Sequence, residues 1–392
     1  MNIFPNIYDL SLLEWIIIGL SILFFIIQVT YYLYIFRQPY KYLSKKEDKD
    51  EKQLSKNESP GISIIITAKN EADNLLANLT LILEQDYPNY QVVVVNNSST
   101  DNTDDVLNEF RNRYPSKLYT TYIPIGSETV NDKKLALTVG IKAAKHEILL
   151  FTEADTKPLT NKWVNEYAKE FAKGKDVVLG ACQLKVGKGI YKKLIQFSNL
   201  MFGIKYLGLA LIKRPYMGIE RNMAYKKNIF FENKGFSSIL NIEYGEDNLF
   251  INRIATRDNT SVVISPDSMV ESNAINQLST WRTIKGKYLI TKKHLKGYGD
   301  KILSFEVISR FAFYSLALLM LVIGIIKPST TLIWASIILL LSRYIIQLIV
   351  INRNSRLFNS GKYFLSLPLF DLLAPIINHQ FMNHEKKRNR RL

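Results

Sequence analysis

An uninterrupted apolar run near the N-terminus constrains the fold more than any other feature of the chain. Residues 12–36 read LLEWIIIGLSILFFIIQVTYYLYIF and carry a single charge, Glu14. A membrane-spanning helix needs about 20 predominantly apolar residues, so this run is long enough to cross a bilayer. Trp15 at one end and the YYLYIF cluster at the other are typical of interfacial aromatic belts. We predict a transmembrane anchor that is retained rather than cleaved as a signal peptide.

Two further apolar runs occur late in the chain, at residues 310–326 and 331–351. The short sequence KPST separates them, which predicts two membrane-spanning helices joined as a hairpin. Arg343 lies inside the second of these runs. Because a guanidinium group is costly in lipid, we expect this side chain to face protein or to reach toward the interface.

The flanking charges predict the orientation of these segments. Basic residues follow the first run and the third run: Lys41, Lys45, Lys46 and Lys49 in one flank, and Arg353, Arg356 and Lys362 in the other. Because cytoplasmic flanks are enriched in lysine and arginine, both flanks, and the chain between them, are predicted to be cytoplasmic. The expected location is therefore the cell (inner) membrane, multi-pass, with the part between the two flanks in the cytoplasm.

The last segment, residues 363–392, is amphipathic and ends in a basic tail. Pro368 and Pro375 interrupt it, so we predict that it lies in the cytoplasmic membrane interface rather than across the bilayer. Residues 291–309, which are basic and directly precede the second apolar run, are predicted to be interfacial as well.

The overall charge is strongly basic, at +16 from 51 Lys and Arg against 35 Asp and Glu. A balance of this size suits nucleic acid, an anionic membrane surface or a phosphate-rich substrate. Much of the excess lies beside the apolar runs, so we expect the membrane as a partner and no nucleic acid. The single cysteine, Cys182, excludes an intrachain disulfide.

The part between the membrane segments alternates strands and helices. After a polar, lysine-rich linker at 37–60, the runs ISIIIT, QVVVVNN and HEILLFT read as buried parallel strands. Leucine and isoleucine recur with helical spacing between the first two runs. This alternation predicts a doubly wound α/β fold, whose ligand lies at the carboxyl ends of the strands.

Polar side chains stand at those predicted strand ends. Glu71 follows the first strand, Asn97 ends the second, and Glu153 and Asp155 follow the third. Two carboxylates held in a partly dry cleft repel each other, and a divalent cation removes that cost. Hard oxygen ligands suit Mg²⁺ or Mn²⁺ bridged to substrate phosphates. We therefore expect a divalent metal as the cofactor.

Two further groups are candidates for chemistry. Glu246 and Asp247 stand directly ahead of an amphipathic helix, where an acid can act as a general base or simply stabilise the helix N-terminus. Lys133 precedes another helix and is either a phosphate contact or a solvated residue. The histidines show no metal-binding spacing.

The ordered set ISIIITAKNE, QDYPNYQVVVVNNSSTDNT, DKKLALTVGIKAA, ILLFTEADTKP, GIERNMAYKK and GEDNLFINRI resembles the family 2 glycosyltransferases of GT-A fold, over residues 61–290. The resemblance implies a membrane-anchored bacterial enzyme that uses a nucleotide diphosphate sugar. It implies that Asp155 binds the metal and that Asp247 activates the acceptor, with Glu246 as the alternative base. It also implies the donor-binding residues: Ala68, Glu71, Asn97, Lys133 and Glu153.

The sequence departs from that family at three places. Asn97 and Glu153 each stand where the family has aspartate. The Gln-x-x-Arg-Trp motif of processive members would align on Ile284–Tyr288, which keeps only the basic and aromatic pair Lys287 and Tyr288. These two residues and Arg282 are candidates for closing over the donor or for contacting the membrane interface. The expected function is a single, inverting sugar transfer to a hydroxyl of a membrane-associated, lipid-linked acceptor. The alternative is a catalytically silent scaffold in an envelope polysaccharide assembly complex.

Overall fold

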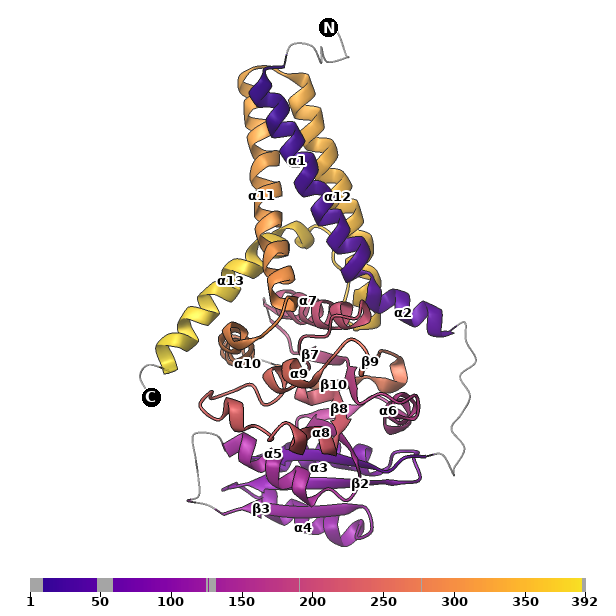
Figure 1. The fold of residues 1–392 in the computed structure, drawn as a ribbon. Helices are drawn as coiled ribbons and strands as arrows, with labels where there is room; N and C mark the ends of the chain where they lie inside the picture. Colours follow the sequence, from indigo (N-terminus) through magenta and orange to yellow (C-terminus); the bar gives the residue numbers. More distant parts are fainter. Residues whose placement is uncertain are drawn as a thin grey trace.

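A sheet domain lies below a bundle of three long helices in the computed structural model of the chain (Figure 1). The structure describes residues 10–47, 59–124, 126, 132–189, 191–275 and 277–389. Most of the predicted linker, at 48–58, and the last residues of the basic tail, at 390–392, lie outside the described residues. The part of the linker that is described contains a helix, α2 (Gln38–Glu47).

The sheet domain is built on a seven-stranded mixed sheet in the order β3-β2-β1-β4-β8-β6-β9. The first four strands are parallel, whereas β8 runs antiparallel to both of its neighbours. The strands are β1 (Ile62–Ala68), β2 (Tyr90–Asn97), β3 (Leu118–Ile123), β4 (Ile148–Glu153), β6 (Val177–Gly180), β8 (Met223–Lys226) and β9 (Thr260–Val263). The predicted α/β class is confirmed, and the predicted strands correspond to β1, β2 and β4.

The continuous apolar runs in these strands follow from helices on both faces of the sheet. Ile64 and Ile66 of β1 belong to one core cluster with α3 (Ala72–Leu83), α4 (Thr103–Arg113) and α6 (Trp163–Ala172). Ile65, between them in sequence, packs in the other cluster with α5 (Asp132–Ala143). Because successive strand residues point to opposite faces, a strand that is covered on both sides has no polar alternation.

A second, smaller sheet begins directly after β4, the third predicted strand. It has the order β5-β10-β7, from β5 (Thr156–Pro158), β10 (Val270–Ile275) and β7 (Cys182–Val186). The backbone N–H of Asn273 in β10 donates to the carbonyl oxygen of Asp155 at 2.7 Å. Asp155 therefore lies in the turn that connects the two sheets. Short helices complete the domain: α8 (Lys227–Glu232), α9 (Asn248–Ile254), η4 (Glu220–Asn222), η5 (Ser237–Ile239) and η6 (Pro266–Ser268).

The bundle consists of α1 (Leu12–Thr30), α11 (Gly299–Ile326) and α12 (Thr330–Leu357), with α1 extended by the π-helical segment η2 (Tyr31–Phe36). These three helices are long and apolar enough to cross a membrane, and each of them exposes several large apolar side chains. α7 (Lys192–Leu211) also qualifies by length and composition, but most of it is buried against the sheet domain. These apolar helices indicate a membrane protein. α11 starts at Gly299, so the predicted interfacial segment 291–309 holds the short helix η7 (Lys292–His294) and the first turns of α11.

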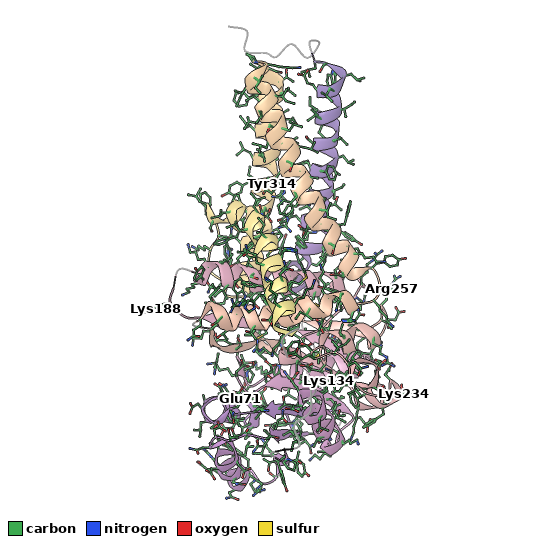
Figure 2. The ribbon with its side chains drawn as sticks, turned by 90° about the vertical axis from the view of Figure 1, so that its left-hand side faces the viewer. Glu71, Lys134, Lys188, Lys234, Arg257 and Tyr314 are labelled. Carbon is green, nitrogen blue, oxygen red and sulfur yellow. The ribbon has the colours of Figure 1, made fainter. Side chains whose placement is uncertain are left out.

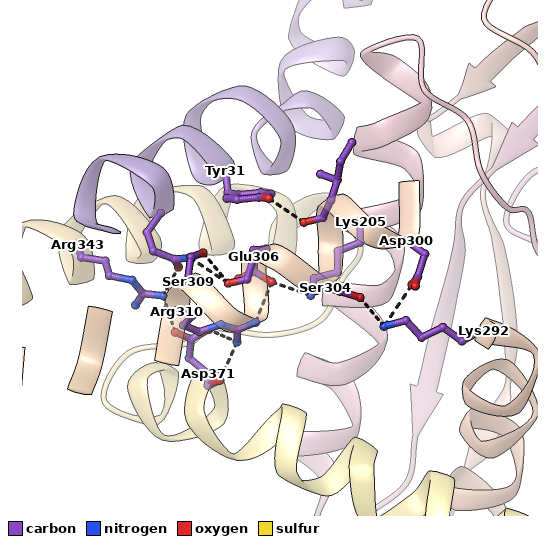
Figure 3. A network of polar contacts seen from close by, with 12 residues as sticks. Tyr31, Lys205, Lys292, Asp300, Ser304, Glu306, Ser309, Arg310, Arg343 and Asp371 are labelled. Atoms are coloured by element: carbon purple, nitrogen blue, oxygen red, sulfur yellow. Dashed lines mark hydrogen bonds and ion pairs between the residues drawn. The ribbon is translucent and has the colours of Figure 1, made fainter. Parts of the chain in front are cut away.

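Charged side chains join the base of the bundle to the last helix, α13 (Ser366–Asn389) (Figure 3). Asp371 accepts hydrogen bonds from Arg310 at 2.8 Å and from Arg343 at 2.8 Å, and all three side chains are buried. Arg343 thus faces protein, as its cost in lipid requires. Pro375 has no N–H to donate to the carbonyl oxygen of Asp371 four residues earlier, and Arg310 Nη1 takes that role at 2.7 Å.

α13 leaves the bundle and runs beside α10 (Leu278–Thr291), where the rings of Trp281 and Phe381 meet edge to face at 5.0 Å between centroids. It is not among the helices that are long and apolar enough to span a membrane. In Figure 1, α7, α10 and part of α13 lie between the bundle and the sheet domain.

Candidate active site

The carboxyl ends of β1, β2 and β4 form one edge of the sheet, and the predicted donor-binding residues follow that edge. Ala68 is fully buried and is opposite Asn96 in the register of β1 and β2. Asn97 is buried at the end of β2, and its Oδ1 has no hydrogen-bond partner among the described residues. Glu71 directly precedes α3 and is labelled in Figure 2. Burial raises the pKa of the Glu71 carboxyl, and the nearby charges of Asp155 and Glu153 contribute to this effect.

Arg221 bridges the two carboxylates that follow β4. Its Nε lies 2.7 Å from Glu153 Oε2, and its Nη2 lies 2.8 Å from Asp155 Oδ2. Burial alone would raise the pKa of Glu153, but Arg221 and Lys133 hold it below the usual range. The cation that offsets the repulsion between these acids is therefore, in this structure, an arginine from η4.

Lys133, at the start of α5, is the second cation of the site. Its Nζ lies 2.6 Å from Glu153 Oε1, 3.0 Å from Glu220 Oε2 and 3.8 Å from Glu246 Oε1. Burial by itself would lower the Lys133 pKa, but the three carboxylates raise it well above its ordinary value. Burial is the largest cause that raises the pKa of Glu220 to about 8; Lys133 lowers this pKa, and the neighbouring acids raise it. The cluster is thus held together by one ammonium group shared among acids.

Asp247 both caps a helix and faces the cleft. Its Oδ1 accepts the backbone N–H of Asn248 at 2.6 Å at the start of α9, and its Oδ2 accepts the hydroxyl of Tyr288 at 2.8 Å. Burial raises the pKa of Asp247 to about 6, and Glu246 adds to the shift. A general base works best when its pKa lies near the working pH, and the raised pKa of Asp247 meets that condition.

These groups line one small cavity of about 60 Å³. Of the sequence-predicted residues, it brings together Lys133, Glu153, Glu246, Asp247, Lys287 and Tyr288. Lys287 also lies over the ring of Tyr244, with 5.1 Å between Nζ and the ring centroid. Asp155 does not line this cavity in the described residues, but it pairs with Arg221, which does. Arg282 does not line this cavity in the part of the chain that the structure describes.

The sequence interpretation assigned no role to Glu220 or Arg221. Both lie in the GIERNMAYKK stretch, directly ahead of β8, which is the antiparallel strand next to β4. The sequence signal that could have identified them is the adjacent pair of opposite charges, Glu220 and Arg221, directly ahead of a strand. Their partners are far away in the chain, because 66 residues separate Arg221 from Asp155.

The oxygen donors fit a hard divalent cation that takes few protein ligands. Glu220 Oε1 and Glu246 Oε2 are buried and accept no hydrogen bond from any described residue. No three His, Cys, Asp or Glu side chains in the described ranges converge as a metal cage. A Mg²⁺ or Mn²⁺ ion commonly uses one or two carboxylates and takes its other ligands from substrate phosphates and water. Asp155 and Glu153 are the neighbouring carboxylates of this kind, and Arg221 pairs with both of them in this structure.

Three comparisons bear on identity. Residues 63–238 match the family described as Glycosyl transferase family 2. A poly-beta-1,6-N-acetyl-D-glucosamine synthase of Staphylococcus epidermidis is 28% identical over 134 residues, 34% of this chain and 30% of the relative. The same enzyme of Staphylococcus aureus strain MSSA476 is 27% identical over 125 residues, 32% of this chain and 28% of the relative. The chain thus spans about a third of the length of these curated relatives.

Among solved structures, the mannosyltransferase PcManGT from Pyrobaculum calidifontis, in complex with GDP-Man and Mn²⁺, is similar with a TM-score of 0.53. The match has 17% sequence identity and covers 84% of this chain and 97% of that chain. At this identity the likeness shows a common fold.

Proposed function

Since residues 63–238 form a family 2 glycosyltransferase domain joined to membrane-spanning helices, we propose that this protein transfers a sugar from a nucleotide diphosphate donor to a membrane-associated acceptor. The transfer inverts the anomeric centre and adds one sugar at a time. The catalytic domain faces the cytoplasm. The observation that carries the proposal is that Asp247, Lys133 and Glu153 line the same cavity.

The reaction is a displacement in which the chain's own groups move one proton and stabilise one leaving group. The acceptor hydroxyl oxygen attacks the anomeric carbon, and the bond from that carbon to the diphosphate breaks. Asp247 takes the hydroxyl proton. The Tyr288 hydroxyl donates a hydrogen bond to Asp247 Oδ2 at 2.8 Å and so fixes the orientation of the carboxylate. Lys133 and Arg221, the cations that line this cavity beside Glu153, stabilise the negative charge that develops on the departing diphosphate. Asn97, with its free Oδ1, contacts the nucleoside beside Ala68 and Glu71.

Asp155, together with Glu153, would hold a divalent metal. When bound, such an ion neutralises charge on the diphosphate. Arg221 would then keep its contact with one carboxylate and release the other.

Asp155→Ala should abolish the stabilisation of the protein by a nucleoside diphosphate with Mn²⁺, because a principal oxygen ligand is lost. The measurement is the thermal unfolding midpoint with UDP or GDP, with and without Mn²⁺, beside donor turnover. Asp73→Ala, which removes an exposed acid from α3, is the matched control and should behave like the wild type. An unchanged Mn²⁺-dependent shift in Asp155→Ala would exclude Asp155 from the donor site.

Release of nucleoside diphosphate from a panel of nucleotide sugars tests the proposed function directly. We expect release to depend on an added membrane extract that contains the acceptor, and to stop in Asp247→Asn. Release that needs no acceptor and is unaffected by Asp247→Asn would contradict the transfer reaction.

A tag inserted at residues 327–330 should be labelled from outside the cell, whereas a C-terminal tag should be accessible only after the membrane is permeabilised. The connection between α11 and α12 is short and lies at the end of the bundle opposite the sheet domain (Figure 1). External labelling of the C-terminal tag would reverse the proposed orientation.

A catalytically silent scaffold is the second candidate. The observation in its favour is that Arg221 and Lys133 already neutralise the carboxylates that would hold a metal. Such a protein would bind no nucleotide sugar under any metal condition, which the same panel detects.

A further inference from the structure

A larger cavity, of about 240 Å³, lies between the active-site cavity and the membrane-spanning helices. α7 and α10 supply much of its wall, and α11 and α13 close it with residues such as Leu303 and Ala374. Its lining is mainly apolar and aromatic, with Phe197, Met201, Phe202, Tyr206, Trp281 and Leu289. A cavity of this composition is suited to a hydrocarbon group.

The two cavities have a common wall. Arg221, Asn248, Ile284 and Tyr288 line both of them. Tyr288 is also the hydroxyl donor to Asp247. A ligand whose chain occupies the larger cavity can therefore present its head group to Asp247. At the other side, Leu303 and Val307 belong to α11, which continues into the bundle.

Among the described residues that line the larger cavity, one cation has no carboxylate partner. Four cations in its lining have carboxylate partners: Lys205 with Glu306, Lys292 with Asp300, Arg310 with Asp371, and Arg221 with Asp155. Lys285 is the exception, since no carboxylate among the described residues lies within ion-pair distance of its Nζ. That Nζ contacts the hydroxyl of Ser198 and lies 5.2 Å from the centroid of the Trp281 ring.

The surroundings of Lys285 disfavour its charge when the cavity holds no anion. Burial lowers the pKa of Lys285 to about 7, and the positive charge of Lys205 adds to the effect. A bound anion would offset both causes, because an opposite charge within a few ångströms favours the ammonium form.

We propose that this cavity binds the lipid phosphate of the acceptor, with the hydrocarbon chain against the aromatic wall and the phosphate against Lys285. The proposal rests on the proposed function in one respect, that the occupant is the acceptor. It adds the chemical class of that acceptor, an anionic lipid, and the residue that recognises its charge. The apolar lining fits the chain, the unpaired lysine fits the phosphate, and the common wall directs the head group to Asp247.

Photolabelling of the full-length protein in a nonionic detergent tests this inference. The probe is a dodecyl phosphate with a diazirine on its chain, and the labelled peptides are mapped by mass spectrometry. We expect labels in α7 and α10, displaced by unlabelled dodecyl phosphate at least tenfold more effectively than by dodecanol. Charged hydrogen bonds contribute enough free energy for a preference of roughly that size.

Lys285→Met should remove the preference for the phosphate over the alcohol and leave dodecanol binding unchanged. Lys285→Arg, which retains the charge, should label like the wild type. Lys293→Met is the matched control, because Lys293 is an exposed lysine of the neighbouring basic segment and does not line the cavity. The displacement experiment on wild-type protein needs no variant, so it decides the question even if Lys285→Met does not fold.

Three results would overturn the inference: equal labelling of Lys285→Met, displacement of the probe by inorganic phosphate alone, or labels confined to the outer faces of α1, α11 and α12. Labelling requires no sugar donor. Labelled protein that transfers no sugar would therefore contradict the proposed function alone. Transfer to a soluble acceptor without labelling would contradict only the lipid site.

Discussion

Replacing Asp247 by asparagine should slow sugar transfer by about 10² to 10⁴-fold, which is the usual contribution of a positioned general base. Asparagine keeps the size of the side chain and an oxygen that can accept the N–H of Asn248, so the cap of α9 is preserved. It cannot accept the acceptor's proton. The measurement is kcat beside the donor Kd for both proteins.

The pKa of Asp247 supplies two controls for this experiment. Because that pKa is raised to about 6, the wild-type rate should fall as pH drops through about 6 and Asp247 becomes protonated. A raised carboxyl pKa also means that the ionised form destabilises the fold above that pH. Asp247→Asn should therefore unfold at the same temperature as the wild type at pH 7, or at a higher one. A variant with near-normal kcat would leave Asp247 as a helix cap and make Glu246 the next candidate.

Asp371→Asn should destabilise the protein by about 3 to 5 kcal/mol, because removing one member of a buried ion pair leaves its partners uncompensated. Here two arginines lose their carboxylate, Arg310 and Arg343, each at 2.8 Å from it. Both belong to helices of the bundle, so the loss should loosen α13 from α11 and α12. The measurement is the unfolding midpoint in detergent, together with the rate of limited proteolysis within α13.

Asp105→Asn is the matched control for this prediction, since it removes an exposed acid from α4 and should change stability by less than about 0.5 kcal/mol. If Asp371→Asn unfolded like that control, the arginines would have other compensation, and the network in Figure 3 would not be what holds α13.

Much of the fold could be predicted from the sequence, because the features concerned are local. β1, β2 and β4 are continuous apolar runs, and a strand covered on both faces requires such a run. α1, α11 and α12 are long and apolar, because lipid offers no hydrogen-bond partners to polar side chains. Asp247 could be placed ahead of α9 because helix N-termini favour acids and the apolar spacing begins after it.

Other features depended on which distant elements meet. α7 has the length and composition of a membrane span, yet the sheet domain covers it, and hydropathy alone cannot distinguish these surroundings. The sequence contains Asp371, Arg310 and Arg343 without indicating that they pair, because ion pairing depends on three helices converging at the base of the bundle. Arg221 reaches Glu153 and Asp155 only because β8 pairs with β4. Composition and periodicity determined which segments avoid water. The packing of remote segments alone decided which charges share a cavity, because Coulomb energy depends on distance in space and not along the chain.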